Sequence, residues 1–159
     1  MNQRIEIGHW EGDTVEGKGH NGGIHTEVER VSRYLAARKI GTINSEQTSI
    51  VQQEVFSKLP CSLRKSTTLD NGRENHLHMR LHSLGMQTYF ADPYSSWQRG
   101  TNENTNGLLR RYLPKKTSFT NLTQEELDDI VAEINNRPRK VLQYKTPVEI
   151  LSGAIQPRM

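Results

Sequence analysis

Cysteine is almost absent from this chain of 159 residues, which has only Cys61. A single cysteine has no partner within the chain, so an internal disulfide and a zinc site built from several cysteines are both excluded. Long apolar runs are missing too. No stretch approaches the roughly 20 apolar residues of a membrane helix, and residues 1–7 alternate charged and aliphatic side chains instead of forming a signal-peptide core. These absences predict a cytoplasmic protein with no membrane partner.

The length suits one domain, because 159 residues can form one sizeable core but not two. The net charge is only +3, but the charged residues are segregated along the chain. Residues 99–116 hold five basic side chains against one acid, residues 137–145 hold four against none, and residues 125–133 hold five acids and no base. We expect the acidic block to be a solvated face, whereas the first basic block shares a predicted helix with Glu103.

Short runs with strand-like alternation or β-branched content occur at residues 4–15, 24–31, 34–41, 66–69 and 86–90. The first three follow one another through short links, which predicts an antiparallel meander. Asp13 lies near the end of the first run. Asp70 directly follows the fourth run and begins an Asp-Asn-Gly turn signal. Both acids are therefore predicted at strand ends, while Trp10 and Tyr34 are predicted in the core.

Capping residues and apolar spacing predict five helices. The first is opened by Asn44 or Ser45 and runs to Pro60, and the next two lie at residues 74–84 and 100–112. The fourth is opened by Thr123, and the last is opened by Thr146 and ended by Gly153. A meander continued by strands that arrive through helical crossovers favours an α/β fold. We expect a mixed five-stranded sheet, an antiparallel meander plus parallel strands, with helices packed on it. This arrangement is that of ribonuclease H-like domains.

Three acids stand where a rigid scaffold can bring them together: Asp13 and Asp70 at strand ends, and Glu103 in the first turn of a helix. Taken singly, each has an ordinary structural role, because aspartates suit turns and the helix dipole favours an acid at a helix start. If the three meet, they offer the oxygen ligands that Mg²⁺ prefers. The choice between these interpretations rests on the surrounding sequence.

The segments around these acids, residues 10–14, 68–72 and 94–104, resemble the three signature segments of DDE transposases, most closely the insertion-sequence-thirty family. The spacing of 33 from Asp70 to Glu103 (103 − 70) also resembles that of retroviral integrases. Supporting segments lie at residues 28–30, 90–94, 135–139 and 144–147. The resemblance covers nearly the whole chain and implies a ribonuclease H-like integrase core.

By this resemblance, Asp13, Asp70 and Glu103 are catalytic acids and the ligands of two Mg²⁺ ions, with Mn²⁺ as a substitute. It implies a transposase, a polynucleotidyl transferase that cleaves transposon DNA ends and transfers the freed 3'-hydroxyl to target DNA without a covalent enzyme intermediate. It also implies a bacterial protein that is associated with the nucleoid when bound to DNA. A homo-oligomeric active complex is implied as well, because two ends must be processed together.

Two features depart from the family pattern. Asn75 stands where the family usually has phenylalanine, which bears on the packing behind Asp70. Family members carry helix-turn-helix DNA-binding segments before this domain, whereas only a dozen residues precede Asp13 here. We therefore expect residues 1–159 to be a single catalytic domain without those segments.

Candidate DNA-binding residues flank Glu103 in the sequence: Trp97, Gln98, Arg99, Asn106, Arg110, Arg111, Lys115 and Lys116. Gly107 would let a phosphate strand come close to the helix. The alternatives are a solubilising surface for the basic side chains and a hydrophobic plug for Trp97. Asn71 and Asn104 are each next to an acid in the sequence, and we expect them to hydrogen-bond to those acids as supporting residues.

Other interpretations stay open at this point. His76, His78 and His82 offer a different metal site, although no glutamate or cysteine at matching spacing completes it, and surface histidines are the simpler interpretation. The rival functions are a ribonuclease H-like nuclease without joining activity and a domesticated, inactive relative that binds only DNA or a protein. Joining of a pre-cut DNA end distinguishes the transposase from the nuclease. The inactive relative would be favoured if the domain bound neither Mg²⁺ nor Mn²⁺ and Asp70→Asn changed nothing in any DNA assay.

Overall fold

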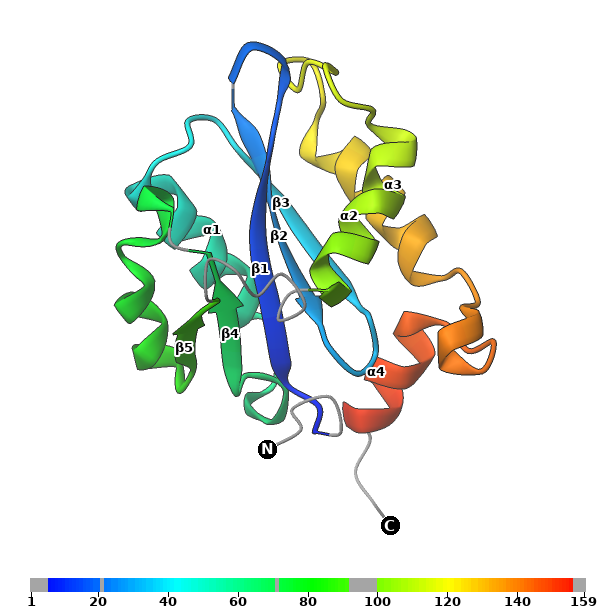
Figure 1. The fold of residues 1–159 in the computed structure, drawn as a ribbon. Helices are drawn as coiled ribbons and strands as arrows, with labels where there is room; N and C mark the ends of the chain where they lie inside the picture. Colours follow the sequence, from blue (N-terminus) through cyan, green and yellow to red (C-terminus); the bar gives the residue numbers. More distant parts are fainter. Residues whose placement is uncertain (1–5, 21, 71, 92–99, 156–159) are drawn as a thin grey trace.

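The computed structural model describes residues 6–20, 22–70, 72–91 and 100–155. At its centre is a five-stranded sheet, in the order β3-β2-β1-β4-β5 (Figure 1). The strands are β1 (His9–Glu16), β2 (Gly23–Glu29), β3 (Leu35–Ile40), β4 (Ser66–Leu69) and β5 (Gln87–Phe90). β2 pairs antiparallel with both β1 and β3, and β4 pairs parallel with both β1 and β5. The predicted mixed sheet, a meander extended by parallel strands, is confirmed.

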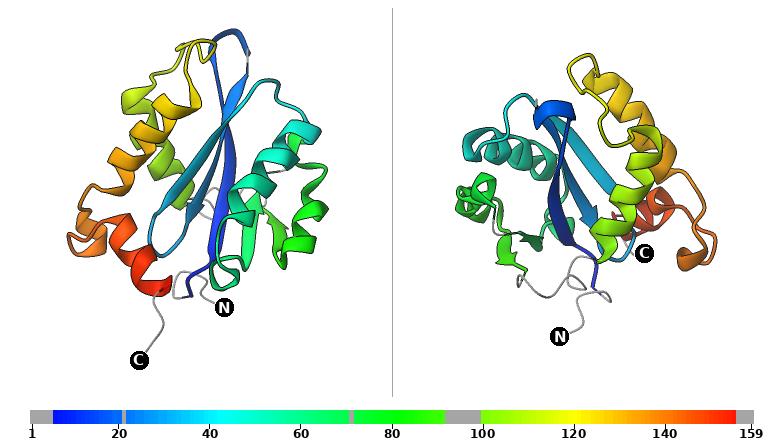
Figure 2. Two further views of the ribbon diagram at one scale, coloured as in Figure 1. Left: turned by 180° about the vertical axis from the view of Figure 1, so that it is seen from behind. Right: turned by 45° about the horizontal axis from the view of Figure 1, so that its top comes forward.

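Helices cover both faces of this sheet (Figures 1 and 2). They are α1 (Ser45–Ser57), α2 (Gly100–Tyr112), α3 (Gln124–Asn135) and α4 (Pro147–Ile155). α1 packs on one face, and α2 and α3 pack on the other. Three predicted caps are present, because Asn44, Thr123 and Thr146 each accept a hydrogen bond from the backbone N–H three residues later. No helix within the described ranges is long and apolar enough to cross a membrane.

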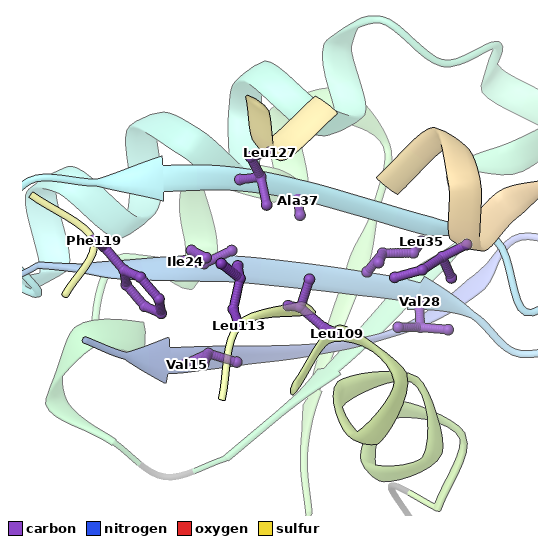
Figure 3. Packing of buried hydrophobic residues seen from close by; sticks show 10 residues of the cluster. Val15, Ile24, Val28, Leu35, Ala37, Leu109, Leu113, Phe119 and Leu127 are labelled. Carbon is purple, nitrogen blue, oxygen red and sulfur yellow. The ribbon is translucent and has the colours of Figure 1, made fainter. Parts of the chain in front are cut away.

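Two hydrophobic clusters hold these layers together, one on each face of the sheet. The cluster beneath α2 and α3 joins alternate residues of the meander, such as Ile24 and Val28, to Leu109 and Leu127 (Figure 3). The cluster on the α1 face is built around Trp10, which is fully buried and packs edge-on against Phe56. The period-two alternation of β1 thus supplies both clusters, with Val15 on one face and Trp10 on the other.

Several predicted boundaries were wrong, including the end of α1, which was expected at Pro60 and lies at Ser57. Residues 74–84 form two 3-10 helices (Arg73–Asn75 and His78–Leu84) instead of one α-helix, and the buried Asn75 turns its amide back to Asp70 instead of supporting a helix. β1 begins at His9, because Gly8 has a φ of 105° and donates its N–H to the Glu29 carboxylate. α4 continues through Gly153 to Ile155, since this glycine keeps helical geometry.

Gly12 of β1 lies directly opposite Glu27 of β2, and the absence of a side chain there makes room for that glutamate. The buried Glu27 carboxylate is hydrogen-bonded to His25 of the same strand (2.5 Å) and accepts from the Thr67 hydroxyl of β4 (2.6 Å). Because β1 lies between β2 and β4, the Glu27 side chain must cross β1 at Gly12. A Cβ on Gly12 would lie 2.3 Å from Glu27 Oε2 and 2.6 Å from Leu69 Cδ2.

We therefore expect Gly12→Ala to lower the free energy of unfolding by about 1–3 kcal/mol, because neither buried neighbour can move away freely. The control is Gly107→Ala on α2, where a Cβ would meet nothing within 4 Å. Alanine there should stabilise the helix by about 0.5–1 kcal/mol. Urea titration followed by circular dichroism measures both. A Gly12→Ala protein as stable as the parent would show that Glu27 does not cross the strand at this point.

Candidate active site

Asp13 lies in β1 on the sheet face that α2 covers. The Thr14 backbone N–H donates to Asp13 Oδ1 (2.9 Å), and the Asn106 amide of α2 donates to Asp13 Oδ2 (3.0 Å). The hydroxyl of Thr26, which is the cross-strand partner of Asp13, donates to the Asn106 side-chain oxygen (3.3 Å). The half-buried Asp13 carboxylate is thus oriented from its own strand and from the helix above it.

Asp70 directly follows β4, as its sequence predicts. Its Oδ1 accepts from the Gly72 backbone N–H (2.9 Å), which is the expected Asx turn, and from the Asn75 amide (2.9 Å). The same amide nitrogen also donates to the Asp70 backbone oxygen (3.1 Å). Asn75 is only 5% exposed, so packing fixes its amide. Asp13 and Asp70 therefore share one feature: each accepts a hydrogen bond from an asparagine side chain.

The parallel pairing of β1 with β4 brings the two aspartates to neighbouring positions. Glu11 pairs with Thr68, an offset of 57 residues (68 − 11). Asp13 and Asp70 have the same offset (70 − 13 = 57), and the Ala91 N–H donates to the Leu69 oxygen, so pairing with β5 continues to the end of β4. Residues level with each other on adjacent parallel strands lie about 5 Å apart and on the same face. The pairing of β1 with β4 ends at Glu11 and Thr68, and the same register extended by two residues would set Asp70 beside Asp13.

Glu103 is exposed in the first turn of α2, one helical turn before Asn106. Residues three apart share a flank of a helix, so the Asn106–Asp13 bond shows that Glu103 belongs to the flank next to β1. The three predicted acids therefore come from two adjacent strands and the helix above them. Within the described residues, no three acidic, histidine or cysteine side chains are close enough together to hold a metal ion.

Three other acids near the sheet, Glu11, Glu27 and Glu29, are fully buried, which distinguishes them from the half-buried aspartates and the exposed Glu103. Glu11 accepts from Arg30 Nε (3.1 Å), and Glu27 is bonded to His25 beneath Gly12. The Glu29 carboxylate accepts backbone N–H groups of the turn that follows β2. The sequence patterns did not single out these glutamates as buried. Alternation assigns a strand residue to one face of the sheet, but it cannot show whether a glutamate on that face is buried. We interpret them as structural.

The asparagines that bond to the aspartates in the described residues are Asn75 and Asn106. Asn71 lies outside the described residues, and Asn104 is exposed without a bond to a described acid. Asn106, predicted as a DNA contact, bonds to Asp13 in this structure. Two positions along a helix differ by about 200° around its axis, so Asn104 and Asn106 face opposite flanks. Asn75 was noticed in the sequence only as a departure from a family pattern, and its contact with Asp70 was missed.

The predicted DNA-binding residues fall into three groups. Trp97, Gln98 and Arg99 lie outside the described residues. Arg111, Lys115 and Lys116 are exposed at the end of α2 and just beyond it. Arg110 donates to the backbone oxygens of Glu16 (3.2 Å) and Leu113 (3.3 Å), so it ties the end of α2 to the end of β1.

The histidines proposed as a different metal site serve another purpose. His78 Nδ1 and His82 Nε2 are both hydrogen-bonded with the Thr88 hydroxyl, at 2.6 and 3.2 Å. Burial lowers the pKa of His78, and the neighbouring His82 lowers it further, so neutral imidazole is favoured. His76 is exposed. In the part of the chain that the structure describes, these histidines join no metal-binding group.

Comparison with known proteins shows that the chain is similar in sequence to transposases over nearly its whole length. No family model matches the chain. Its sequence is similar to the transposase InsI for insertion sequence element IS30C of Escherichia coli (strain K12), with 47% identity over 156 residues. It is also similar to the transposase for insertion sequence element IS1086 of Cupriavidus metallidurans, with 42% identity over 156 residues. Each match covers 98% of this chain, but the chain spans only 40% and 46% of those relatives.

The fold is similar to the catalytic core domain of BIV integrase, with a TM-score of 0.71. The match covers 92% of this chain and 95% of the integrase chain at 19% sequence identity. At that identity the likeness concerns the fold alone, and it confirms the predicted integrase core, a ribonuclease H-like arrangement.

Removing either asparagine amide should loosen the aspartate that it holds. We expect Asn75→Ala to lower the free energy of unfolding by about 1–3 kcal/mol, because a buried bond to a charged group is lost. Both Asn75→Ala and Asn106→Ala should weaken Mn²⁺ binding, measured by calorimetry, by about 10–100-fold. Asn121→Ala, at an exposed site, is the control. Equal Mn²⁺ affinity in all three variants would show that the amides do not prepare the carboxylates for a cation.

Proposed function

The chain belongs to the family of the IS30 transposases, and from this premise we propose that it is the catalytic domain of a DDE transposase. In this proposal it cleaves the DNA ends of a transposable element and joins them to target DNA. What supports the proposal most directly is the parallel register of β1 and β4, which would set Asp70 beside Asp13 if it extended two residues further, together with the bond of each aspartate to an asparagine amide. The flank of α2 next to them contributes Glu103.

Asp13, Asp70 and Glu103 would together hold divalent cations, Mg²⁺ or Mn²⁺. Their chemistry fits, because all three offer carboxylate oxygens, and the two aspartates are half-buried and oriented while Glu103 remains exposed. Carboxylates repel one another, so we expect Glu103 to approach the aspartates only when their negative charge is balanced. When bound, a pair of such ions activates an attacking oxygen and stabilises the leaving oxygen of a phosphodiester.

The remaining residues would position the reacting groups. Asn75 and Asn106 hold the two aspartates in fixed orientations, which lowers the entropy cost of assembling the site. In the first step water attacks the phosphodiester at the transposon end and frees a 3'-hydroxyl. That hydroxyl then attacks a phosphodiester of the target, and the target's own 3' oxygen leaves. No bond to the protein forms in either step.

DNA would lie along the cationic end of α2. Arg111, Lys115 and Lys116 are exposed there and are suited to phosphate contacts. Arg110 would contribute its charge while keeping its bonds to backbone oxygens. Two DNA ends must be joined in one event, so we propose a homo-oligomer as the active form. A plain nuclease and an inactive DNA-binding relative are less favoured, because transposases are the relatives and no acid of the triad is replaced.

Neutralising the triad tests the proposed chemistry. We expect Asp13→Asn, Asp70→Asn and Glu103→Gln each to reduce joining of a pre-cut end to plasmid DNA by more than about a hundredfold, since loss of an outer partner alone costs 10–100-fold. Removal of Mg²⁺ and Mn²⁺ with a chelator should have the same effect. The control is Glu125→Gln on α3, which should join DNA at the parental rate. Cleavage without joining by the parent protein would favour the plain nuclease.

Charge reversal tests the DNA path along α2. Lys115→Glu with Lys116→Glu should weaken DNA binding and lower the slope of log affinity against log salt by about 0.9 for each lost phosphate contact. Lys58→Glu, at the end of α1 on the other face, is the matched control. An unchanged slope in the double variant would mean that these lysines only solubilise the surface.

A further inference from the structure

The segment 137–145, between α3 and α4, is a second cationic element (Figure 1). It contains Arg137, Arg139, Lys140 and Lys145 and no acid. Its backbone forms a closed hairpin, because the Arg139 N–H donates to the Lys145 oxygen (3.0 Å) and the Tyr144 N–H donates to the Arg139 oxygen (2.8 Å). Its charges are therefore held in a defined arrangement and do not belong to a loose tail.

The tip of this hairpin is strained and presents apolar side chains to solvent. Gln143 and Tyr144 have φ angles of 56° and 66°, a left-handed conformation that costs roughly 1–2 kcal/mol for each non-glycine residue. Tyr144 is 69% exposed and Val141 is 59% exposed, so their burial does not compensate this cost. Strain of this kind is concentrated at sites where a ligand or partner is bound.

Two guanidinium groups lie at the base of the hairpin, and neither forms an ion pair with an acid among the described residues. Arg137 Nη2 donates to the Tyr112 hydroxyl of α2 (2.8 Å). Arg139 Nη1 is buried and has no hydrogen-bond partner in the part of the chain that the structure describes. Burial lowers the pKa of Arg139, and the positive charge of Arg137 lowers it further. A buried, unbonded cationic N–H is unfavourable, and an anion placed between the two groups would relieve both effects.

We propose that Arg137 and Arg139 form a binding site for a phosphate group of the DNA backbone, with the exposed Lys140 and Lys145 adding positive charge at its rim. Guanidinium groups match phosphate oxygens with paired, charge-assisted hydrogen bonds. The site is separate from the triad: Tyr112, which anchors Arg137, follows Glu103 by nine residues (112 − 103), or about 14 Å along α2.

The identity of the anion rests on the proposed function, because a protein that acts on DNA meets backbone phosphates first. An acidic surface of a second copy is the competing occupant, since exposed acids of α3 lie within the block 125–133. The two occupants predict different measurements. Phosphate binding depends on salt through release of counterions from DNA, whereas contact between copies changes the oligomeric state.

The test measures binding of the whole chain to a short fluorescein-labelled DNA duplex, by anisotropy, without divalent metal and over a range of salt concentrations. The Arg137→Gln, Arg139→Gln double variant should bind on the order of tenfold more weakly, and its salt slope should fall by about 1. Arg139→Lys keeps the charge and should retain the parental slope with a smaller loss of affinity. Lys58→Gln, which is exposed at the end of α1, should behave like the parent.

The outcomes separate this inference from the proposed function. If the double variant matches Lys58→Gln in affinity and slope while the parent still joins DNA ends, the phosphate site is wrong and the transposase proposal stands. If the parent neither cleaves nor joins DNA but the salt slope of the double variant falls by about 1, the phosphate site is supported and the transposase proposal is wrong. A change in sedimentation with an unchanged slope would overturn the phosphate assignment in favour of a second copy. If the double variant unfolds, the slope of the Arg139→Lys variant decides, and an altered slope there would contradict the proposal.

Discussion

The parallel pairing between β1 and β4 is the interaction on which the candidate site depends. Asp70 follows Asp13 by the same offset of 57 residues, so this register, extended two residues beyond the last pair, would set the two aspartates level on the face that α2 covers. Since successive strand residues point to opposite faces, a slip of one residue would turn one aspartate away from the other. Neither the asparagine contacts nor the position of α2 could compensate for such a slip. The chemistry of the site is therefore a consequence of strand register.

The Glu27 carboxylate beneath β1 helps to fix that register. It bridges β2 and β4 by bonding to His25 and Thr67, and it can pass β1 only because Gly12 has no side chain. A buried acid is costly unless its oxygens are bonded, so any register that left Glu27 without Thr67 would be penalised. The residue just before Asp13 thus links the stability of the sheet to the placement of the candidate catalytic acid.

Asparagine side chains couple the two aspartates to different parts of the fold. Asn106 connects Asp13 to α2, and Asn75 connects Asp70 to the turn after β4. Asn75 could not be interpreted from the sequence, because residues 74–84 have an α-helical pattern but adopt two 3-10 helices. In an α-helix its amide would point elsewhere. The local deviation from the predicted helix is what brings this side chain to Asp70.

By itself, the sequence determined the order and type of most elements, the three candidate acids and the family, because alternation, capping residues and motif segments are local properties of the chain. Asn44, Thr123 and Thr146 cap the helices they were expected to open. Only the tertiary structure decided that Asn106 and not Asn104 reaches Asp13, that Arg110 bonds backbone oxygens, and that Arg139 Nη1 finds no hydrogen-bond partner among the described residues. Periodicity defines which face of a helix or strand a side chain occupies. The partner that it meets there depends on strand register and on the rotation of each helix about its own axis, and both are determined by residues distant in the sequence.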